Sequence, residues 1–212
     1  LSTAFDTHGV KYLDKLGLDL FKIPSGEINN FPFLRAIAKI GKPVILSTGM
    51  SYIKEISDAL AVFKKYGLDR KDITILHCNT EYPTPMKDVN LKAMLTIGDK
   101  FKVHIGYSDH TLGIEVPIAA VAMGASVIEK HFTLDKNYSD FRDHQLSADP
   151  SEMSMMVNEI RKTEKILGKE EKKPQLCEKG MKIEGRRSIA VSCDLPKGTK
   201  LSNSHLMWVR PG

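Results

Sequence analysis

The 212-residue sequence has few cysteines, few aromatic residues and no long uninterrupted hydrophobic segment. Its three cysteines, Cys78, Cys177 and Cys193, are odd in number and widely spaced, which argues against a disulfide framework and against a zinc knuckle. The longest apolar segment, around 116–128, is too short and too interrupted to span a bilayer. We therefore expect no membrane partner.

Charge of either sign is also modest. The formal net charge is +5, and the basic residues are spread along the chain rather than clustered. This pattern argues against a nucleic-acid partner and is compatible with an anionic small substrate. Charged and aromatic residues follow Leu1-Ser2-Thr3 at once, which is not the pattern of a signal peptide, so we expect a cytoplasmic protein.

Short apolar runs alternate with helical patterns along the first two thirds of the chain. We predict strands at 20–23, 44–46, 73–78, 103–107 and 127–131, the end of another strand at 1–3, and helices between them. Strict alternation predicts a parallel sheet in an α/β protein, and polar loops at every C-terminal strand end favour a (β/α)8 TIM-type barrel over an open sheet. Because six strands do not close a barrel of eight, we expect the N-terminal strands to be missing from this chain.

A second region follows the last long helix. The pattern predicts that helix over 150–167, with Met153, Met156, Val157 and Ile160 packed in the core. We predict that the C-terminal part of the barrel covers 1–168, that a Lys/Glu/Pro-rich linker covers 169–183, and that 184–212 begins a small second domain. That last segment reads as strand, turn and strand, and is too short to fold alone.

Two histidines follow neighbouring predicted strands. His110 and His131 come at the C-terminal ends of the strands at 103–107 and 127–131, the edge of a barrel at which active sites are built. Two neutral imidazoles at adjacent strand ends can share one divalent metal. A single histidine at such a position is more often a hydrogen-bonded structural residue, and the residues alone leave both interpretations open.

The loops after two other strands offer groups suited to an anion. An ammonium, hydroxyls and exposed backbone N–H groups come together there, from Lys22, Ser25, Gly26, Ser47, Thr48 and Gly49. Such groups bind phosphate or carboxylate, although Ser-Gly and Thr-Gly pairs are also common in turns and helix caps. The residues thus indicate a barrel-type enzyme with an anion site and a candidate metal pair.

Four further polar residues have two interpretations each. Glu27 and Asp143 are either acid/base groups or solvated loop carboxylates. Asn79 and Tyr82 either bind a polyol or shape the proline-rich loop in which they lie.

Five ordered motifs give the chain a specific resemblance. They are KIPSGE (22–27), LSTGM (46–50), HCNTEYPTP (77–85), GYSDHTLGIE (106–115) and EKHFTLD (129–135). In order and spacing they resemble the sialic acid synthase (N-acetylneuraminate synthase) family, and the likeness extends from the segment at 2–6 to WVRPG at 208–212.

The resemblance implies a fold, a reaction and a partner. Members of this family have a (β/α)8 barrel followed by a small antifreeze-like (SAF, β-clip) domain, and they form domain-swapped homodimers. They condense phosphoenolpyruvate with the open-chain aldehyde of an N-acetylmannosamine-type sugar and release phosphate. Asn79-Thr80-Glu81-Tyr82 and the segment 86–91 are similar to legionaminic acid synthases, whose sugar is a 6-deoxy diacetamido relative.

The resemblance also assigns roles position by position. His110 and His131 match the metal ligands, usually for Mn²⁺, with Mg²⁺ or Co²⁺ as alternatives, and Glu27 and Lys22 match catalytic residues. The residues expected to bind substrate are Thr3, Ser25, Ser47, Asn79, Tyr82, Asp143 and Arg210. Two other hypotheses stay open: another metal-dependent barrel enzyme, such as an aldolase or an epimerase, and a non-catalytic sugar-binding module.

Overall fold

A computed structural model describes residues 1–210 of the chain. The chain forms two compact units, Leu1–Gly168 and Lys169–Gly212. Pro211 and Gly212, the last residues of the predicted second domain, lie outside the described residues. Within residues 1–210 no helix has both the length and the apolar composition needed to cross a membrane.

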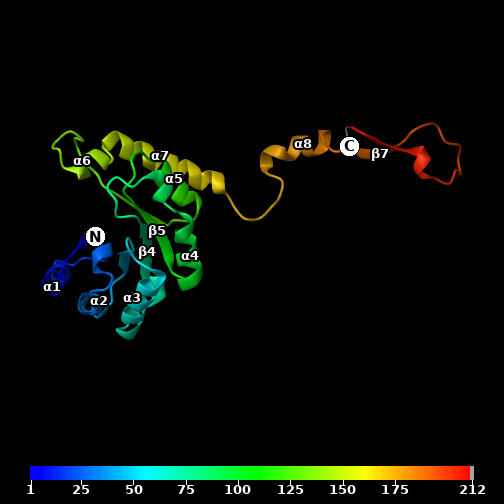
Figure 1. Cartoon of the computed structure of the whole chain (residues 1–212). Coiled ribbons are helices and arrows are strands. Elements are labelled where there is room, and N and C mark those ends of the chain that lie inside the picture. The colour runs from blue at the N-terminus through cyan, green and yellow to red at the C-terminus, as the bar shows by residue number, and fades with distance from the viewer. Residues whose placement is uncertain (211–212) are drawn as a thin grey trace. The chain divides into compact units, whose positions relative to one another are not determined.

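The first unit contains one sheet of six parallel strands that are neighbours in chain order (Figure 1). The strands are β1 (Ser2–Thr3), β2 (Phe21–Ile23), β3 (Val44–Ser47), β4 (Ile73–Cys78), β5 (His104–Asp109) and β6 (Val127–Lys130). The helices are α1 (Thr7–Lys15), α2 (Phe31–Ala38), α3 (Ile53–Lys65), α4 (Lys92–Phe101), α5 (Glu115–Ala122), α6 (Arg142–Leu146) and α7 (Pro150–Leu167). The predicted parallel sheet is confirmed, and its sequential order fits a TIM-type fold.

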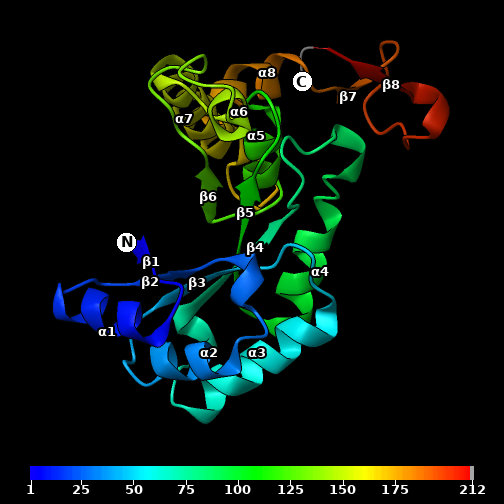
Figure 2. The ribbon, with the colours of Figure 1, turned by 60° about the vertical axis from the view of Figure 1, so that its left-hand side comes forward.

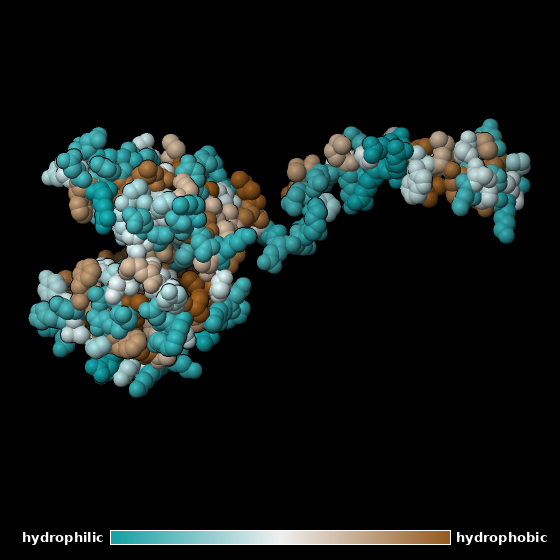
Figure 3. All heavy atoms as spheres, in the orientation of Figure 1, coloured by the Kyte–Doolittle hydropathy of each residue, from teal (hydrophilic) through white to brown (hydrophobic). Residues whose placement is uncertain are grey.

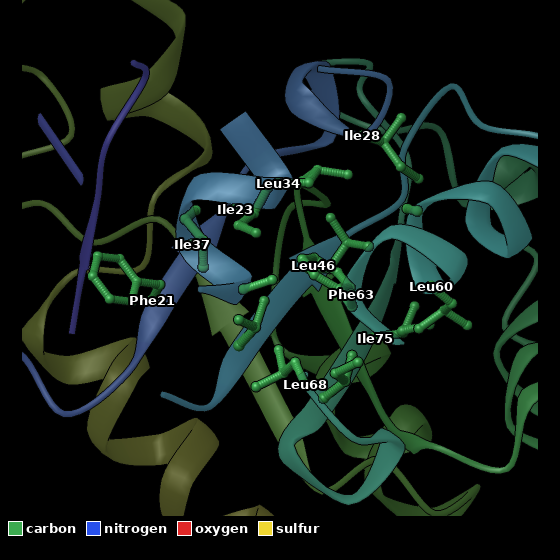
Figure 4. Packing of buried hydrophobic residues seen from close by; sticks show 14 of the residues in the cluster. Phe21, Ile23, Ile28, Leu34, Ile37, Leu46, Leu60, Phe63, Leu68 and Ile75 are labelled. Carbon is green, nitrogen blue, oxygen red and sulfur yellow. The ribbon is translucent and has the colours of Figure 1, made fainter. Parts of the chain in front are cut away.

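Alternation of side chains along each strand separates the core from the candidate site. Phe21 and Ile23 of β2 are fully buried against the helices, so Lys22 between them points to the opposite face of the sheet. Figure 2 shows α1, α2 and α3 side by side along one face of this sheet. The apolar residues of β2, β3 and β4 pack there against α2 and α3, as Figure 4 shows for Leu46, Ile75 and Phe63.

Hydrogen bonds to capping side chains mark the start of three helices. The Asp6 carboxylate accepts a hydrogen bond from the Gly9 amide at 2.6 Å at the start of α1, and the Asn30 side chain accepts one from Phe33 at 3.3 Å at the start of α2. At α7 the Asp149 carboxylate accepts from the Glu152 amide, Glu152 accepts in return from the Asp149 amide, and Pro150 is the first helical residue. These caps fix where α1, α2 and α7 begin.

The predicted core stripe of α7 is correct in part only. Met156 is 4% exposed, Met153 and Ile160 are half-buried, and Val157 is 43% exposed. The prediction was wrong for Val157 because this side of α7 faces solvent in the described part of the chain. α7 packs instead mainly against α5.

The second unit is small and has little interior. It contains two 3₁₀ turns, η4 (Leu176–Glu178) and η5 (Asn203–His205), the helix α8 (Lys179–Glu184), and the antiparallel strands β7 (Ser188–Val191) and β8 (Leu206–Val209). The segment predicted as an irregular linker, 169–183, therefore includes η4 and most of α8. None of residues 169–210 is buried.

Candidate active site at the C-terminal strand ends

A cleft of about 310 Å³ lies at the C-terminal ends of the strands of the first unit. Figure 3 shows the surface of this unit hollowed between the side that carries α5 to α7 and the side that carries α1 to α3. Five of the six strands, or the loops that follow them, contribute to the lining, which consists of Lys22, Pro24, Ser25, Gly26, Ser47, Met50, Cys78, Thr80, Tyr82, Ser108, His110, Glu129 and His131. This edge is the place at which the sequence predicted the site.

Lys22 is the only cation that reaches the cleft among its lining residues. The residue is 8% exposed, and its Nζ lies 3.4 Å from Oε1 of Glu129. The same Glu129 oxygen accepts a hydrogen bond from Ser108 Oγ at 2.7 Å. A shielded ammonium attracts an anion more strongly than a solvated one because water screens it less.

Two hydroxyl groups, from Ser47 at the end of β3 and from Ser25 in the loop after β2, complete this side of the cleft. We call this side the anion wall (Lys22, Ser25 and Ser47). The Gly49 amide donates a hydrogen bond to Ser25 Oγ at 2.9 Å, which fixes the position of that hydroxyl. Ser47 Oγ is buried and has no hydrogen-bond partner among the described residues. Because buried polar groups are almost always paired, this oxygen is suited to a ligand. Thr48 differs, since its hydroxyl donates to the carbonyl of Leu76 at 2.9 Å.

Three rings form the opposite side, which we call the histidine wall (Tyr82, His110 and His131). The ring centroids of His110 and His131 are 5.2 Å apart, and the Tyr82 ring lies 4.1 Å from the first and 5.6 Å from the second. The structure thus brings together the two histidines that the sequence predicted as a pair. The guanidinium carbon of Arg142 lies 5.1 Å from the centre of the Tyr82 ring.

The state of His110 suits a metal ligand. Its Nδ1 lies 2.6 Å from the carbonyl oxygen of Asn79, so Nδ1 carries the proton and Nε2 keeps its lone pair. Burial lowers the pKa of His110, although the Asn79 carbonyl opposes this shift, and the neutral ring is therefore favoured at pH 7. The residues present therefore fit a divalent metal held by two imidazoles. Among residues 1–210 no group of three or more His, Cys, Asp or Glu side chains is arranged to hold a metal.

Asn79 and Tyr82 have different positions. The Asn79 side chain accepts from the Glu81 amide at 2.8 Å and donates to the Asp88 carbonyl at 3.3 Å, so it shapes the loop and does not line the cleft. Tyr82 does line the cleft. Burial raises the pKa of Tyr82, so its phenol stays protonated and can donate a hydrogen bond.

The remaining predicted residues lie outside the lining of the cleft. The Glu27 carboxylate accepts from Asn30 Nδ2 at 2.6 Å, and Thr3 lies on the edge strand β1. Asp143 is in the first turn of α6, with Oδ2 3.8 Å from Nδ1 of His131. Arg210 is exposed and belongs to the second unit, after β8. The roles predicted for these four residues stay predictions.

Glu129, Ser108 and Cys78 also line the cleft and were not predicted from the sequence. The register pairs Cys78 with Ser108 and Ser108 with Glu129, so the three side chains share one face of the sheet. A usable signal was present, because Ser108 and Glu129 each precede a predicted histidine by two residues and therefore point the same way.

Comparisons with known proteins agree with this architecture. Residues 1–172 match the NeuB family. N,N'-diacetyllegionaminic acid synthases from Campylobacter jejuni and Legionella pneumophila are 50% and 47% identical to the chain; 100% of the chain aligns with 63% and 60% of their lengths. A crystal structure of N-acetylneuraminic acid synthetase from Leptospira borgpetersenii is 40% identical, with a TM-score of 0.78, over 84% of this chain and 61% of that one.

The chain therefore spans about three fifths of the length of the curated relatives it matches. The match to the family covers most of the chain, including all six strands of the parallel sheet and every residue that lines the cleft. On this evidence the chain belongs to the NeuB family.

Proposed function

We propose that this chain is part of a nonulosonic acid synthase, which condenses phosphoenolpyruvate with the open-chain aldehyde of an N-acetylmannosamine-type sugar and releases phosphate. The observation that carries the proposal is the pairing of two different walls across one cleft. A buried ammonium and a free hydroxyl face two imidazoles and a phenol. One wall suits an anion, and the other suits the oxygens of a sugar.

The anion wall is the proposed site of phosphoenolpyruvate. This substrate carries several negative charges at pH 7, and Lys22 supplies the compensating charge. Ser47 Oγ, which has no partner among residues 1–210, and Ser25 Oγ supply hydrogen bonds. Glu129 already shares the Lys22 ammonium, so its carboxylate limits how much further negative charge the cleft accepts.

The histidine wall is the proposed site of the sugar aldehyde. His110 and His131 would hold a divalent metal, Mn²⁺ in our proposal, and when bound it acts as a Lewis acid on the aldehyde oxygen. The Asn79 carbonyl fixes the tautomer of His110, and the Tyr82 phenol donates to a sugar oxygen.

The reaction forms one carbon–carbon bond and breaks the carbon–oxygen bond that joins C2 of phosphoenolpyruvate to its phosphate. The C3 carbon of phosphoenolpyruvate attacks the aldehyde carbon, and the aldehyde oxygen takes a proton to become a hydroxyl. Water adds at C2 and loses a proton, and the tetrahedral intermediate then expels inorganic phosphate to leave a 2-keto acid. We assign proton transfer at this intermediate to Glu27, whose carboxylate Asn30 orients.

The legionaminic acid branch is the more specific part of the proposal. Two legionaminic acid synthases are 50% and 47% identical to the chain, against 40% for the sialic acid synthetase of known structure. We therefore propose a 6-deoxy-2,4-diacetamido sugar as the preferred acceptor.

The proposal extends to the complete assembly. We propose that the six strands are part of an eight-stranded barrel and that the second unit is the beginning of an SAF domain. In a domain-swapped homodimer this domain would bring Arg210 to the partner's cleft. We place the enzyme in the cytoplasm, without a nucleic-acid or membrane partner.

Phosphate release by the full-length gene product tests the function. The protein is given phosphoenolpyruvate and Mn²⁺ with N-acetylmannosamine, with its 6-deoxy diacetamido analogue, or without sugar. We expect release that depends on the sugar and is faster with the analogue. Release without sugar, or none with either sugar from a folded protein that binds Mn²⁺, contradicts the proposal and favours another barrel enzyme or a binding module.

A further inference from the structure

Behind the histidine wall lies a buried ion pair that the chemistry proposed above does not use. Asp109 and Lys130 are the last residues of β5 and β6, and the strand register places them side by side. Side chains alternate along a strand, so both point away from the cleft, whereas Ser108 and Glu129 point into it. His110 and His131 each follow directly in the chain.

The pair is enclosed and tightly bonded. The Asp109 and Lys130 side chains are 0% and 2% exposed, and Lys130 Nζ lies 2.6 Å from Oδ2 of Asp109. The other carboxylate oxygen, Oδ1, accepts hydrogen bonds from the amide of Thr111 at 3.0 Å and from its hydroxyl at 2.8 Å. Lys130 Nζ also donates to the carbonyl of Thr111 at 2.7 Å.

These bonds determine the backbone on both sides of His110. Asp109 precedes this histidine, and Thr111 follows it with both its amide and its carbonyl bonded to the ion pair. The carbonyl of His110 accepts from the amide of Thr84 at 2.9 Å, which ties the same turn to the loop after β4. The turn therefore has one bonded arrangement, and this arrangement presents the His110 ring to the Asn79 carbonyl.

Stability alone does not account for such a pair. Removing two charges from water costs about as much as their attraction returns, and an apolar pair of similar volume is often equally stable. What an apolar pair lacks is the set of directed bonds to Thr111. The geometry thus favours a positioning role over a purely stabilising one.

We propose that Asp109 and Lys130 form a brace that sets the orientation of His110 and its spacing from His131. Both are positioning residues, since they act through the turn and lie on the side of the sheet away from the cleft. The metal part of this inference rests on the proposed function, and the orientation of His110 does not.

The test compares four forms of the full-length gene product: wild type, the double variant Asp109→Leu/Lys130→Met, Ile37→Val and His131→Ala. The double variant removes both charges together with the bonds that Asp109 and Lys130 make to Thr111, and its two apolar side chains leave no unpaired buried charge. Ile37 is fully buried in α2, and its variant lowers stability without touching the turn. Mn²⁺ affinity is measured by electron paramagnetic resonance, and the His110 tautomer by ¹⁵N NMR of the metal-free protein.

We expect the double variant to fold, to bind Mn²⁺ about tenfold more weakly and to show a mixture of His110 tautomers. Ile37→Val keeps the affinity and the single tautomer of the wild type, and His131→Ala binds Mn²⁺ about 100-fold more weakly. A double variant with wild-type affinity and a single His110 tautomer overturns the brace. If wild type and His131→Ala bind Mn²⁺ equally weakly, the metal site is wrong, and the tautomer measurement alone decides the brace.

Discussion

The two walls of the cleft are held in different ways. The anion wall rises from β2 and β3, whose opposite face belongs to the large hydrophobic cluster formed with α2 and α3. Both histidines of the histidine wall follow β5 and β6. These strands pack against a smaller hydrophobic cluster and carry the Asp109–Lys130 brace; the buried residues of that cluster are Val89, Met94, Tyr107, Val116, Ala120 and Ala125. Apolar packing is non-directional, whereas hydrogen bonds fix orientation. The strands behind the histidines thus have a directional support that the apolar packing behind β2 and β3 does not supply.

Removing the charge of the anion wall is the largest change we predict. Lys22→Met keeps the length of the side chain and removes the cation of the cleft, so we expect kcat/KM for phosphoenolpyruvate to fall by about 10² to 10³. Lys42→Met is the control. The Nζ of this lysine lies 2.7 Å from Oδ1 of Asp14, and neither residue lines the cleft. Steady-state phosphate release measures both variants. If only the KM for the sugar rises, Lys22 binds the sugar and its assignment to phosphoenolpyruvate is wrong.

Truncating the histidine wall should affect the metal first. For His131→Ala we expect Mn²⁺ affinity to fall by about 100-fold, since one of two imidazoles is removed. His104→Ala is a matched control: it lies on the same sheet, is exposed, and begins β5 at the edge opposite to the cleft. Calorimetric titration of both variants measures the affinity. Equal affinities in the two variants would show that the histidine pair is structural.

Substituting alanine for each of two glycines beside the anion wall tests how closely that part of the protein is packed. A Cβ added to Gly49 would lie 2.5 Å from Cγ2 of Thr80 and 2.9 Å from Sγ of Cys78, whereas one added to Gly26 meets nothing within 4 Å. We expect Gly49→Ala to lower the free energy of unfolding by about 1–3 kcal/mol. Gly26→Ala should stay within about 0.5 kcal/mol of the wild type. Urea unfolding of the two variants measures both values, and similar values would contradict the close packing at Gly49.

The sequence predicted the sheet and the edge at which the site lies, because these depend on local periodicity and on the parallel pairing of strands. The continuous apolar run at 44–46 predicts a buried strand. The pairing of His110 with His131 follows from their positions at two adjacent strand ends. The directions of side chains in loops were not predictable. Asn79 turns away from the cleft because the Glu81 amide and the Asp88 carbonyl bind it.

The exposure of Val157 was unpredictable for a related reason. Helical periodicity shows which residues share a side of α7, and packing against α5 decides how wide the buried stripe is. The same holds for the Asp109–Lys130 brace, since two charged residues in a sequence read as surface residues until strand register brings them together.

The smallest predicted effect concerns Cys78, which lines the cleft beside Ser25 of the anion wall. Burial raises the pKa of the Cys78 thiol, and the hydrogen bond with Ser25 at 3.3 Å opposes this shift only partly. The thiolate is the reactive form, so at pH 8 Cys78 should react with a disulfide reagent about tenfold more slowly than the exposed Cys177 and Cys193. Its rate should rise as the pH passes above the usual range of a thiol, because only then does the thiolate form.

Thiol labelling followed over time at each of the three positions measures this difference: Cys177 and Cys193 should react fast and Cys78 slowly, and Cys78→Ser should remove that slow phase alone. Three equal rates would mean that solvent reaches Cys78 freely, and the shielding from water that we assign to Lys22 would then be overstated too. If phosphoenolpyruvate slows the reaction of Cys78 further and the sugar does not, the anion binds beside Ser25. The two walls would then be distinguished by the substrate that each one binds.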